Sequence, residues 1–517
     1  MIQTSPFPLE KIWIRERGRI DPDKIAVIDG SENVTFQKLL ERASSRADQL
    51  KKLGVLQGDV IGAFLPNTLF AVEIFHAVHL CRATLLPLNL RLTASEINFQ
   101  INETRAKILI AGEEDLISLA SEVSENSEFS PRLVIDSEDN QLVWLDAGEQ
   151  FSAPGKDGLG EMEHAEDVPW VILYTSGTTG TPKGVPLTAR HLGASAMASL
   201  AHLGVLREDR WLACVPLFHI AGLSILTRSV LAGSTVILHK NFDANKVSQA
   251  VDEQRVTLMS LVPTMLHRLV DARLADSRKT VLSLRAILVG GAACSDALRQ
   301  QSLELGLPVL RTYGLTEACS QVATESYPPD HHKKSEPPTS LQGIQVRIVD
   351  TFGKTRAAGE EGEILVRGAM VMDHYYKRVN ESQKALQDGW LHTGDIGFLN
   401  DQGGLCVLNR RSDLIVTGGE NVYPVEVEAC LSSHPGVEEA CVTGEDDLEF
   451  GQRVVAWVVL KQDSDAGEVE LQKYCRRSLA GYKIPRSIMF LQQLPRNVSG
   501  KIMRNKLVKR SFYALDG

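Results

Sequence analysis

Hydrophobic residues in the first half of the chain recur alternately at helical and at extended spacings. Between Phe36 and Leu53 they step by three or four positions, which predicts an amphipathic helix that Gly54 ends. The apolar run Asp59–Leu65 then predicts a buried strand. Further strand-like runs occupy residues 106–110, 132–135, 168–174, 235–238 and 286–289. Strands that alternate with helices predict an α/β fold with largely parallel sheets.

The pattern changes after residue 342, where short β-type runs cluster. These runs are Gln345–Val349, Glu363–Val366 and Leu405–Leu408, and they predict a smaller β-rich module. A polar cluster that begins at Arg410 separates this module from a last segment with its own strand and helix patterns. We therefore expect two domains, residues 1–411 and residues 412–517.

Composition and charge narrow the class of protein. Of the 517 residues, 43% are hydrophobic and 23% are charged, which is typical of a globular chain and not of a disordered one. The formal net charge of −10 is unfavourable for binding nucleic acid or anionic lipid over the whole surface. A polyanion would have to be bound by a local group of residues, and we expect no nucleic-acid partner.

Membrane and export signals are not found in the sequence. The longest apolar run, Trp211–Thr227, contains His219, stops at Arg228 and falls short of the roughly 18 uncharged residues of a spanning helix. The first six residues lack the basic start of a signal peptide. Eight scattered cysteines without a C-x-x-C pair are typical of reduced thiols. We therefore expect a cytoplasmic protein without a membrane span.

A loop rich in glycine and hydroxyl side chains follows the strand predicted at 168–174. It reads Thr175-Ser176-Gly177-Thr178-Thr179-Gly180-Thr181-Pro182-Lys183. Glycines let the backbone approach an anion, hydroxyls donate to phosphate oxygens, and Lys183 adds a positive charge. The loop is not a Walker A motif, because no glycine directly precedes the lysine and no serine or threonine follows it. A surface turn is the alternative to a phosphate-binding loop.

This loop resembles the signature loop of the AMP-forming adenylating superfamily, which includes acyl-CoA synthetases, peptide-synthetase adenylation domains and luciferases. Four further motifs resemble those of the superfamily and occur in its order: Arg311–Glu317, Gly389–Asp395, Arg410–Pro424 and Pro495–Lys501. The resemblance covers nearly the whole chain. It implies a large N-terminal domain of two α/β subdomains plus a distorted β-barrel. A small, mobile α+β C-terminal domain would follow a hinge near Ser412.

The activity that the resemblance implies has two steps. ATP and a carboxylate react to an acyl-AMP and pyrophosphate, and a thiol, usually that of CoA, then displaces AMP. The attacking carboxylate and the α-phosphate are both anionic, so cations and hydrogen-bond donors must surround them. The implied small molecules are ATP, Mg²⁺, CoA and a carboxylic acid.

The resemblance also assigns roles to single residues. The residues implied to hold the β- and γ-phosphates are Thr175, Ser176, Gly177, Thr178, Thr179, Gly180 and Lys183. Glu317 corresponds to the carboxylate that binds Mg²⁺, and Thr316 beside it reaches the α-phosphate. The residues implied to surround adenine are Gly290, Gly291, Ala292, Thr312 and Tyr313. Asp395 corresponds to the acceptor of both ribose hydroxyls, and Arg410 to an arginine that contacts ribose and phosphate.

Two implied roles concern the C-terminal domain. Lys501 corresponds to the lysine that contacts both the attacking carboxylate and the α-phosphate in the first step. Since it lies on the small domain, it can be withdrawn for the second step. Rotation about Ser412 would then bring Gly418 and Gly419 to the tunnel that admits the pantetheine arm of CoA.

The choice of acid depends on less general segments. The resemblance implies that a helix beginning at Pro216–His219 walls the acyl pocket, with His219 near the tunnel mouth. Arg228 is a cation in an otherwise apolar helix. It either extends to water at the helix end or pairs with a second acidic group on the substrate.

The second interpretation of Arg228 agrees with a closer resemblance. Phe218–Ser224, Val262–Leu266 and Thr312–Thr324 are similar to the 2-succinylbenzoate–CoA ligases of menaquinone synthesis, whose substrate carries two carboxylates. Ser320 would then line the pocket. One departure is the stretch Lys334–Pro338, which lacks the glycines that relatives carry after the Thr-Glu motif.

Alternative functions stay open at this point. They are a medium- or long-chain fatty-acyl-CoA ligase, another aryl-CoA ligase, and a stand-alone adenylation enzyme that loads a carrier protein. A fatty-acyl ligase would need an apolar tunnel without a cation at its end. The sequence leaves the oligomeric state open, a homo-oligomer included.

Overall fold

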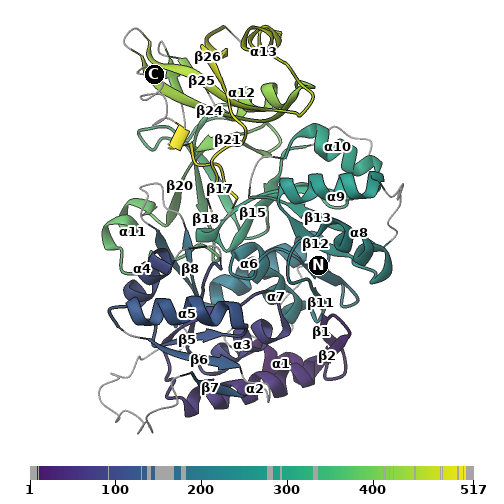
Figure 1. The fold of residues 1–517 in the computed structure, drawn as a ribbon, viewed down its shortest axis with the longest axis vertical. Helices are drawn as coiled ribbons and strands as arrows, with labels where there is room; N and C mark the ends of the chain where they lie inside the picture. The colour runs from purple at the N-terminus through teal and green to yellow at the C-terminus, as the bar shows by residue number, and fades with distance from the viewer. Residues whose placement is uncertain are drawn as a thin grey trace. The chain divides into compact units, whose positions relative to one another are not determined.

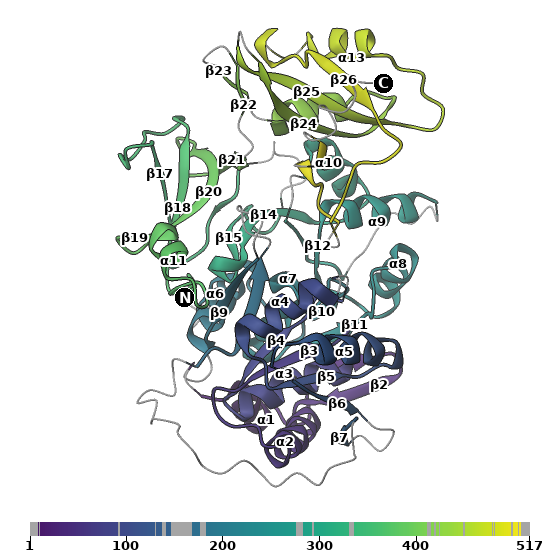
Figure 2. The same ribbon diagram turned by 60° about the vertical axis from the view of Figure 1, so that its left-hand side comes forward.

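The structure is a computed structural model, and its described residues form two compact units. The described residues are 9, 11–90, 92, 94–129, 131–136, 141–145, 168–175, 182–275, 283–291, 294–329, 336–410, 415–417, 420–422, 424–447, 450–477, 479, 481–497, 500–504 and 506–507. The first unit comprises Met1–Val346 and Val366–Leu391, and the second comprises Arg347–Leu365 and His392–Gly517. Figures 1 and 2 show the chain coloured from its N-terminus to its C-terminus. Ser412 is not described, so the expected domain boundary beside it stays a prediction.

The larger sheet of the first unit has nine strands and is parallel in its centre. From edge to edge it runs β16 (Thr339–Ser340), β15 (Ser320–Thr324), β14 (Val309–Leu315), β13 (Ala286–Val289), β12 (Leu258–Leu261), β10 (Arg210–Ala213), β11 (Thr235–Leu238), β1 (Ile25–Asp29) and β2 (Glu32–Thr35). The strands from β14 to β1 pair in parallel, whereas β15, β16 and β2 join antiparallel. The carboxyl ends of β13 and β14 therefore open on the same edge, where ligands bind in α/β proteins.

The second sheet of this unit has seven strands. Its order is β7 (Leu142–Trp144), β6 (Arg132–Asp136), β5 (Ile108–Ala111), β3 (Val60–Phe64), β4 (Thr84–Pro87), β8 (Val171–Thr175) and β9 (Lys183–Leu187). All neighbours from β6 to β8 pair in parallel, and β9 returns antiparallel beside β8. The largely parallel α/β fold expected from the sequence is confirmed.

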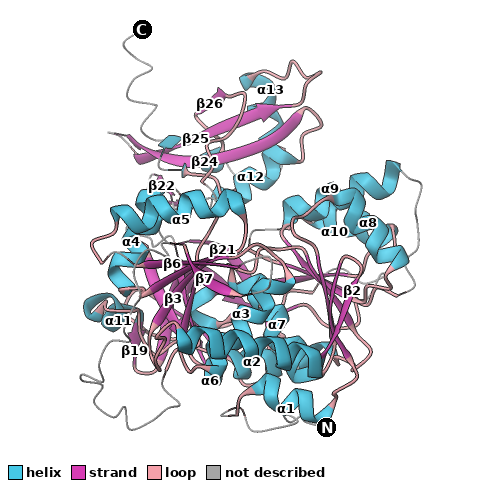
Figure 3. Cartoon of the chain, turned by 60° about the horizontal axis from the view of Figure 1, so that its bottom comes forward, coloured by secondary structure: helices cyan, strands magenta, loops and turns pink. Residues whose placement is uncertain are grey.

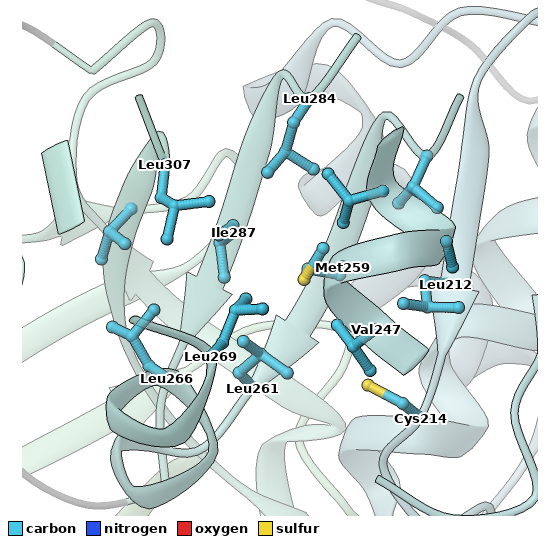
Figure 4. Close-up of a cluster of buried hydrophobic side chains, with 14 of the residues drawn as sticks. Leu212, Cys214, Val247, Met259, Leu261, Leu266, Leu269, Leu284, Ile287 and Leu307 are labelled. Atoms are coloured by element: carbon cyan, nitrogen blue, oxygen red, sulfur yellow. The ribbon is translucent and has the colours of Figure 1, made fainter. Parts of the chain in front are cut away.

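Helices cover both sheets of the first unit. They are α1 (Trp13–Ile20), α2 (Phe36–Lys52), α3 (Leu69–Leu80), α4 (Ala94–Thr104), α5 (Glu114–Asn126), α6 (Ala189–Leu203), α7 (Ile220–Ala232), α8 (Ala244–Glu253), α9 (Pro263–Ala275) and α10 (Asp296–Glu304). The short helix α11 (Val379–Ala385) buries none of its residues. Figure 3 shows α2, α3, α6 and α7 between the two sheets, with α4 and α5 on the far side of the smaller one. In Figure 4, Met259 of β12 and Ile287 of β13 pack against Val247 of α8 and Leu269 of α9, in a fully buried core.

The remaining strands form two further sheets, of which the first takes strands from both units and the other lies in the second unit. One has the order β17 (Gln345–Val349), β18 (Gly362–Arg367), β20 (Trp390–Leu399) and β19 (Leu386–Gln387), with β21 (Leu405–Arg410) beside β20. The other has the order β23 (Glu420–Val422), β22 (Ile415–Thr417), β25 (Gly451–Leu460) and β24 (Val437–Asp447), with β26 (Ser487–Phe490) beside β25. Apolar residues of β24 and β25 form a separate core with α12 (Pro424–Ser432) and α13 (Glu468–Cys475).

Most predicted elements are present with shifts of a few residues. The predicted helix is α2, where the Thr35 hydroxyl accepts from the Lys38 N–H at the start and Gly54 takes a φ of +85° after the end. The strands predicted at 235–238 and 286–289 are β11 and β13. All eight cysteines are free thiols. Among the described residues, no helix combines the length and apolarity that crossing a membrane requires.

Candidate active site

The predicted phosphate loop lies between the paired strands β8 and β9. Thr175, the last residue of β8, is the register partner of Lys183, the first residue of β9. The hairpin therefore brings both ends of the loop together, with both side chains half-buried. Residues 176–181 lie outside the described residues, so the roles expected of Ser176, Gly177, Thr178, Thr179 and Gly180 stay predictions.

Glu317, the expected metal carboxylate, lies in a tight turn after β14. A 3-10 helix spans Thr316–Ala318, and Cys319 and Ser320 after it both have positive φ, at 52° and 95°. The chain folds back so closely that a Cβ on Gly314 would lie 1.7 Å from the Ser320 carbonyl oxygen. Only glycine fits at position 314, and the turn fixes where the Glu317 backbone stands.

A tyrosine from a distant segment contacts both the loop lysine and the carboxylate that is expected to bind the metal. The Tyr375 hydroxyl donates to Glu317 Oε1 at 2.9 Å, and the Lys183 Nζ lies 5.1 Å from the centre of the Tyr375 ring. Lys183 and Glu317 of the first unit thus both contact one side chain, and the ligand roles expected of them stay predictions. Tyr375 is not recognisable as a site residue from the sequence, because neither spacing nor charge distinguishes it in Asp373–Lys377.

The residues expected around adenine meet at the carboxyl ends of β13 and β14. A Cβ on Gly290 would lie 2.8 Å from the Thr312 side chain, and Gly291 has a φ of +80°. The Thr312 hydroxyl contacts the Ala323 carbonyl and the Thr324 hydroxyl. Tyr313 is half-buried beside them. Ala292 lies outside the described residues.

Arg228 is buried in α7 and reaches toward Ser320. Its residue exposure is only 1%, and its Nη2 lies 3.5 Å from the Ser320 hydroxyl. The guanidinium stands 5.4 Å from the Trp211 ring centre. Among the described residues Nε has no hydrogen-bond partner, and no carboxylate pairs with the side chain. The alternative that Arg228 extends to water is therefore wrong.

Burial lowers the pKa of Arg228 to about 9, since desolvation disfavours the charged form. At neutral pH the group still carries its proton. Arg228 is therefore a positive charge within an apolar helix, and no protein anion lies beside it in the described part of the chain. An anionic ligand would stabilise this arrangement.

The wall of the expected acyl pocket begins later than predicted. Helix α7 starts at Ile220 with His219 as its N-cap, so the prediction that it begins at Pro216 is wrong. The physical reason is Asn67: its side chain accepts from the Leu217 N–H at 2.9 Å and donates to the Val215 carbonyl at 2.9 Å. These bonds fix Val215 and Leu217 outside the helix, and the His219 N–H closes a turn on the Pro216 carbonyl at 3.1 Å. His219 is half-buried against Phe218.

In the second unit, the strand pair β20–β21 aligns Asp395 with Arg410. Asp395 is buried, and its N–H donates to the Thr393 hydroxyl at 3.0 Å. The backbone before it is held by Glu363, which accepts from the Gly394 N–H at 3.1 Å. The two residues expected to bind ribose are thus partners across one ladder. Only the backbone of Arg410 is described.

Lys501 lies at an exposed turn of the second unit. The Lys501 N–H donates to the Asn497 side chain, and the Asn497 N–H donates back to the Lys501 carbonyl, each at 2.9 Å. Gly500 between them has a φ of +82°. The turn presents Lys501 at the surface. Gly418 and Gly419 lie outside the described residues, and their role stays a prediction.

The donor set fits a substrate-held magnesium ion. Within the described ranges no three His, Cys, Asp or Glu side chains gather into a metal-binding cluster. Mg²⁺ is commonly bound by one or two carboxylates together with substrate phosphates, while waters complete its octahedron. Glu317, close to Lys183 of the phosphate loop, offers a hard oxygen donor of this kind.

Comparison with known proteins agrees with this geometry. Residues 14–376 match the AMP-binding enzymes, and residues 426–501 match the C-terminal domain of AMP-binding enzymes. The 2-succinylbenzoate–CoA ligase of Bacillus licheniformis is 40% identical over 96% of this chain and 98% of its own length.

Solved structures agree as well. The o-succinylbenzoate CoA synthetase of Bacillus subtilis, in complex with its acyl-adenylate intermediate, is 36% identical with a TM-score of 0.84, over 96% of this chain and 97% of that chain. The same enzyme with ATP and a magnesium ion also gives a TM-score of 0.84 at 36% identity, over 96% of this chain and 98% of that chain. The match over most of the chain confirms the expected superfamily: the protein belongs to the family of AMP-binding enzymes.

Proposed function

We propose that the protein is an AMP-forming 2-succinylbenzoate–CoA ligase. It joins ATP and the acid into an acyl-adenylate and pyrophosphate, and CoA then displaces AMP to give the thioester. The curated relatives and the solved structures with this name support the reaction class. The observation that carries the choice of acid is the buried guanidinium of Arg228, which has no carboxylate partner among the described residues.

The charge of Arg228 explains the preference for an acid with two carboxylates. One carboxylate must remain free to attack the α-phosphate. The other would enter the apolar surroundings of α7 and pair with the guanidinium, while the Ser320 hydroxyl, 3.5 Å away, donates a further hydrogen bond. A buried charge without an opposite charge beside it costs several kcal/mol, so a carboxylate bound next to Arg228 would offset that cost.

In the first step, the negatively charged carboxylate of the acid attacks the negatively charged α-phosphate of ATP. Lys183, Thr175 and the other hydroxyls of the loop hold the phosphates, and Thr316 and Glu317 stand at the end of β14 beside them. Bound Mg²⁺ supplies charge neutralisation and a template for the phosphates. Positively charged and N–H or O–H groups in this position lower the barrier because negative charge concentrates where the carboxylate approaches phosphorus.

The second unit supplies the remaining groups of the proposal. Asp395 and Arg410 hold the ribose, and Lys501 contacts the attacking carboxylate and the α-phosphate during the first step. A division into residues 1–411 and 412–517, with a hinge at Ser412, would let Lys501 leave before Gly418 and Gly419 line the CoA tunnel. His219 would stand where the tunnel meets the acyl pocket.

The test is pyrophosphate release over a panel of acids at fixed ATP and Mg²⁺. The panel contains 2-succinylbenzoate, benzoate, octanoate and palmitate. We expect release with 2-succinylbenzoate and a far lower specificity constant with each monocarboxylic acid. Equal or better use of the fatty acids would contradict the proposal in favour of the fatty-acyl ligase. Thioester formation with free CoA, read by mass spectrometry, separates a CoA ligase from an enzyme that loads a carrier protein.

A further inference from the structure

The segment Met372–Tyr376 connects three parts of the candidate active site. The Met372 N–H donates to the Glu317 carbonyl at 2.8 Å, and the Tyr376 N–H donates to the Gly184 carbonyl at 2.8 Å. Between them, Asp373 accepts from Arg190 Nη2 at 2.7 Å, at the start of α6. The segment is therefore fixed to the metal-carboxylate turn, to the residue after Lys183 and to the helix that follows the phosphate loop.

Tyr375 is the side chain of this segment that faces the charged groups. It is 8% exposed, and its N–H is held by the Ser382 hydroxyl at 2.9 Å. Its hydroxyl donates to Glu317 Oε1 at 2.9 Å. The face of its ring receives the Lys183 ammonium at 5.1 Å from the centre, within cation–π range.

We propose that Tyr375 is a positioning residue that keeps Glu317 and Lys183 apart and each free for its ligand, so that Glu317 binds the metal and Lys183 the phosphates of ATP. This inference rests on the proposed function. It adds a residue that lies outside the motifs on which the resemblance rests.

The physical reason is that Glu317 and Lys183 carry opposite charges on either side of one tyrosine, and without that tyrosine the two groups would attract and neutralise each other. Among the described residues no ion pair joins Lys183 to Glu317; each instead contacts Tyr375. The hydroxyl occupies one carboxylate oxygen and leaves Oε2 for a metal, while the ring face stabilises the ammonium without consuming its N–H donors. Without the tyrosine, forming a Lys183–Glu317 pair would compete with metal and phosphate binding.

The backbone bonds make this arrangement rigid. Glu317 is held at its carbonyl by Met372 and at its side chain by Tyr375, three residues apart in the same segment. Partners of this kind fix the rotamer of a metal ligand, and their loss typically weakens metal affinity by about 10–100-fold. The loss should therefore appear in metal binding and not in metal-free nucleotide binding.

The test uses the full-length protein and two substitutions. Tyr375→Phe removes the hydroxyl and keeps the ring face for Lys183, whereas Tyr375→Leu removes both. Mn²⁺ binding in the presence of ATP is read by electron paramagnetic resonance without the acid, and ATP binding in EDTA by calorimetry. Tyr474→Phe, which removes a tyrosine hydroxyl bonded to Ser433 in the second unit, is the matched control.

We expect Tyr375→Phe to weaken Mn²⁺ binding by about 10–100-fold and to leave the metal-free ATP affinity within about twofold. Tyr375→Leu should weaken both, and Tyr474→Phe neither. Unchanged Mn²⁺ affinity in Tyr375→Phe would overturn the inference. A loss of metal-free ATP affinity as large as the loss of Mn²⁺ affinity would also overturn it, because it would indicate a damaged fold. The binding assays contain no carboxylic acid, so an error in the proposed acid substrate would not change the expected Mn²⁺ and ATP affinities. Wild-type protein that binds no Mn²⁺–ATP would overturn both the proposed function and this inference.

Discussion

The guanidinium of Arg228 lies 3.5 Å from the hydroxyl of Ser320. Arg228 belongs to helix α7, and Ser320 follows the turn after β14, 92 positions later in the sequence. Ser320 stands three residues after Glu317, so one turn contributes to the proposed acid-recognition site at one end and to the proposed metal site at the other. The acid and the metal–ATP complex would therefore be aligned by a single short piece of backbone, and a change in that turn should disturb both.

Gly314→Ala tests this coupling. The new Cβ would lie 1.7 Å from the Ser320 carbonyl oxygen, a backbone atom that can move only with its turn. We expect a loss of folding stability of about 1–3 kcal/mol from overpacking. We also expect higher KM values for both ATP and the acid, measured in initial-rate assays.

Gly481→Ala is the control, because a Cβ there meets nothing within 4 Å. It should leave both KM values unchanged. If Gly314→Ala loses stability but keeps both KM values, the turn does not align the acid with ATP, and the coupling is contradicted.

Lys501→Ala should affect the two half-reactions differently. In the transition state of the first step, negative charge concentrates between the carboxylate and the α-phosphate. A cation that contacts both groups therefore stabilises the transition state more than the ground state. We expect acyl-AMP formation to slow by about 10²–10³-fold. Conversion of synthetic acyl-AMP and CoA to the thioester, followed in a stopped-flow assay, should stay near the wild-type rate.

Ser412→Pro should have the reverse effect, because proline restricts the backbone rotation that the second step requires. Lys506→Ala, another exposed lysine of the same unit, should alter neither step. Equal slowing of both half-reactions by Lys501→Ala would show that the lysine does not alternate between them.

The pH dependence of stability should contain a contribution from two histidines of α3, the buried His76 and the half-buried His79. Burial lowers the pKa of His76 and of His79 to about 3, and for His79 the nearby charges of His76 and Arg82 act in the same direction. Since an unfolded histidine has a pKa near 6.5, the unfolded chain binds more protons between about pH 3 and pH 6.5. The free energy of unfolding should therefore fall as the pH drops through this window.

His79→Phe isolates one of these groups. The phenyl ring can keep the stacking that His79 makes on Trp170, with ring centres 3.8 Å apart. In urea titrations between pH 4 and pH 6, the slope of unfolding free energy against pH should fall by up to about 1.4 kcal/mol per unit. Above pH 7.5 wild type and variant should have the same slope. Equal slopes in the acid range would contradict a neutral His79 in the folded state.

The sequence predicts elements and motifs well where the signal is local. The strands β8, β11 and β13 and the cation in α7 were all predicted from adjacent residues. The fold could also be inferred, because five motifs resemble one superfamily in order. The phosphate loop itself and the hinge lie outside the described residues and stay predictions.

What the sequence could not show depends on contacts between distant segments. Asn67 shapes the chain before α7 from 150 positions away, and Tyr375 meets Glu317 from 58 positions away. Neither residue type stands out in its own segment. The sequence also left open whether Arg228 reaches water, since the length of α7 beyond it and the helix packing around it decide this.

The most direct measurement compares 2-succinylbenzoate with an analogue that keeps only the reacting carboxylate. The specificity constants for pyrophosphate release are determined for wild type, Arg228→Leu and the control Arg273→Leu. Arg273 is an equally buried arginine, but it is paired with Asp252 on neighbouring helices. Removing one partner of a buried charge pair costs about 2–5 kcal/mol.

Wild type and Arg273→Leu should therefore prefer the diacid strongly, and Arg228→Leu should lose most of that preference while its KM for ATP stays unchanged. If Arg228→Leu prefers the diacid as strongly as wild type does, Arg228 does not recognise the second carboxylate, and the assignment of the acid loses its structural support.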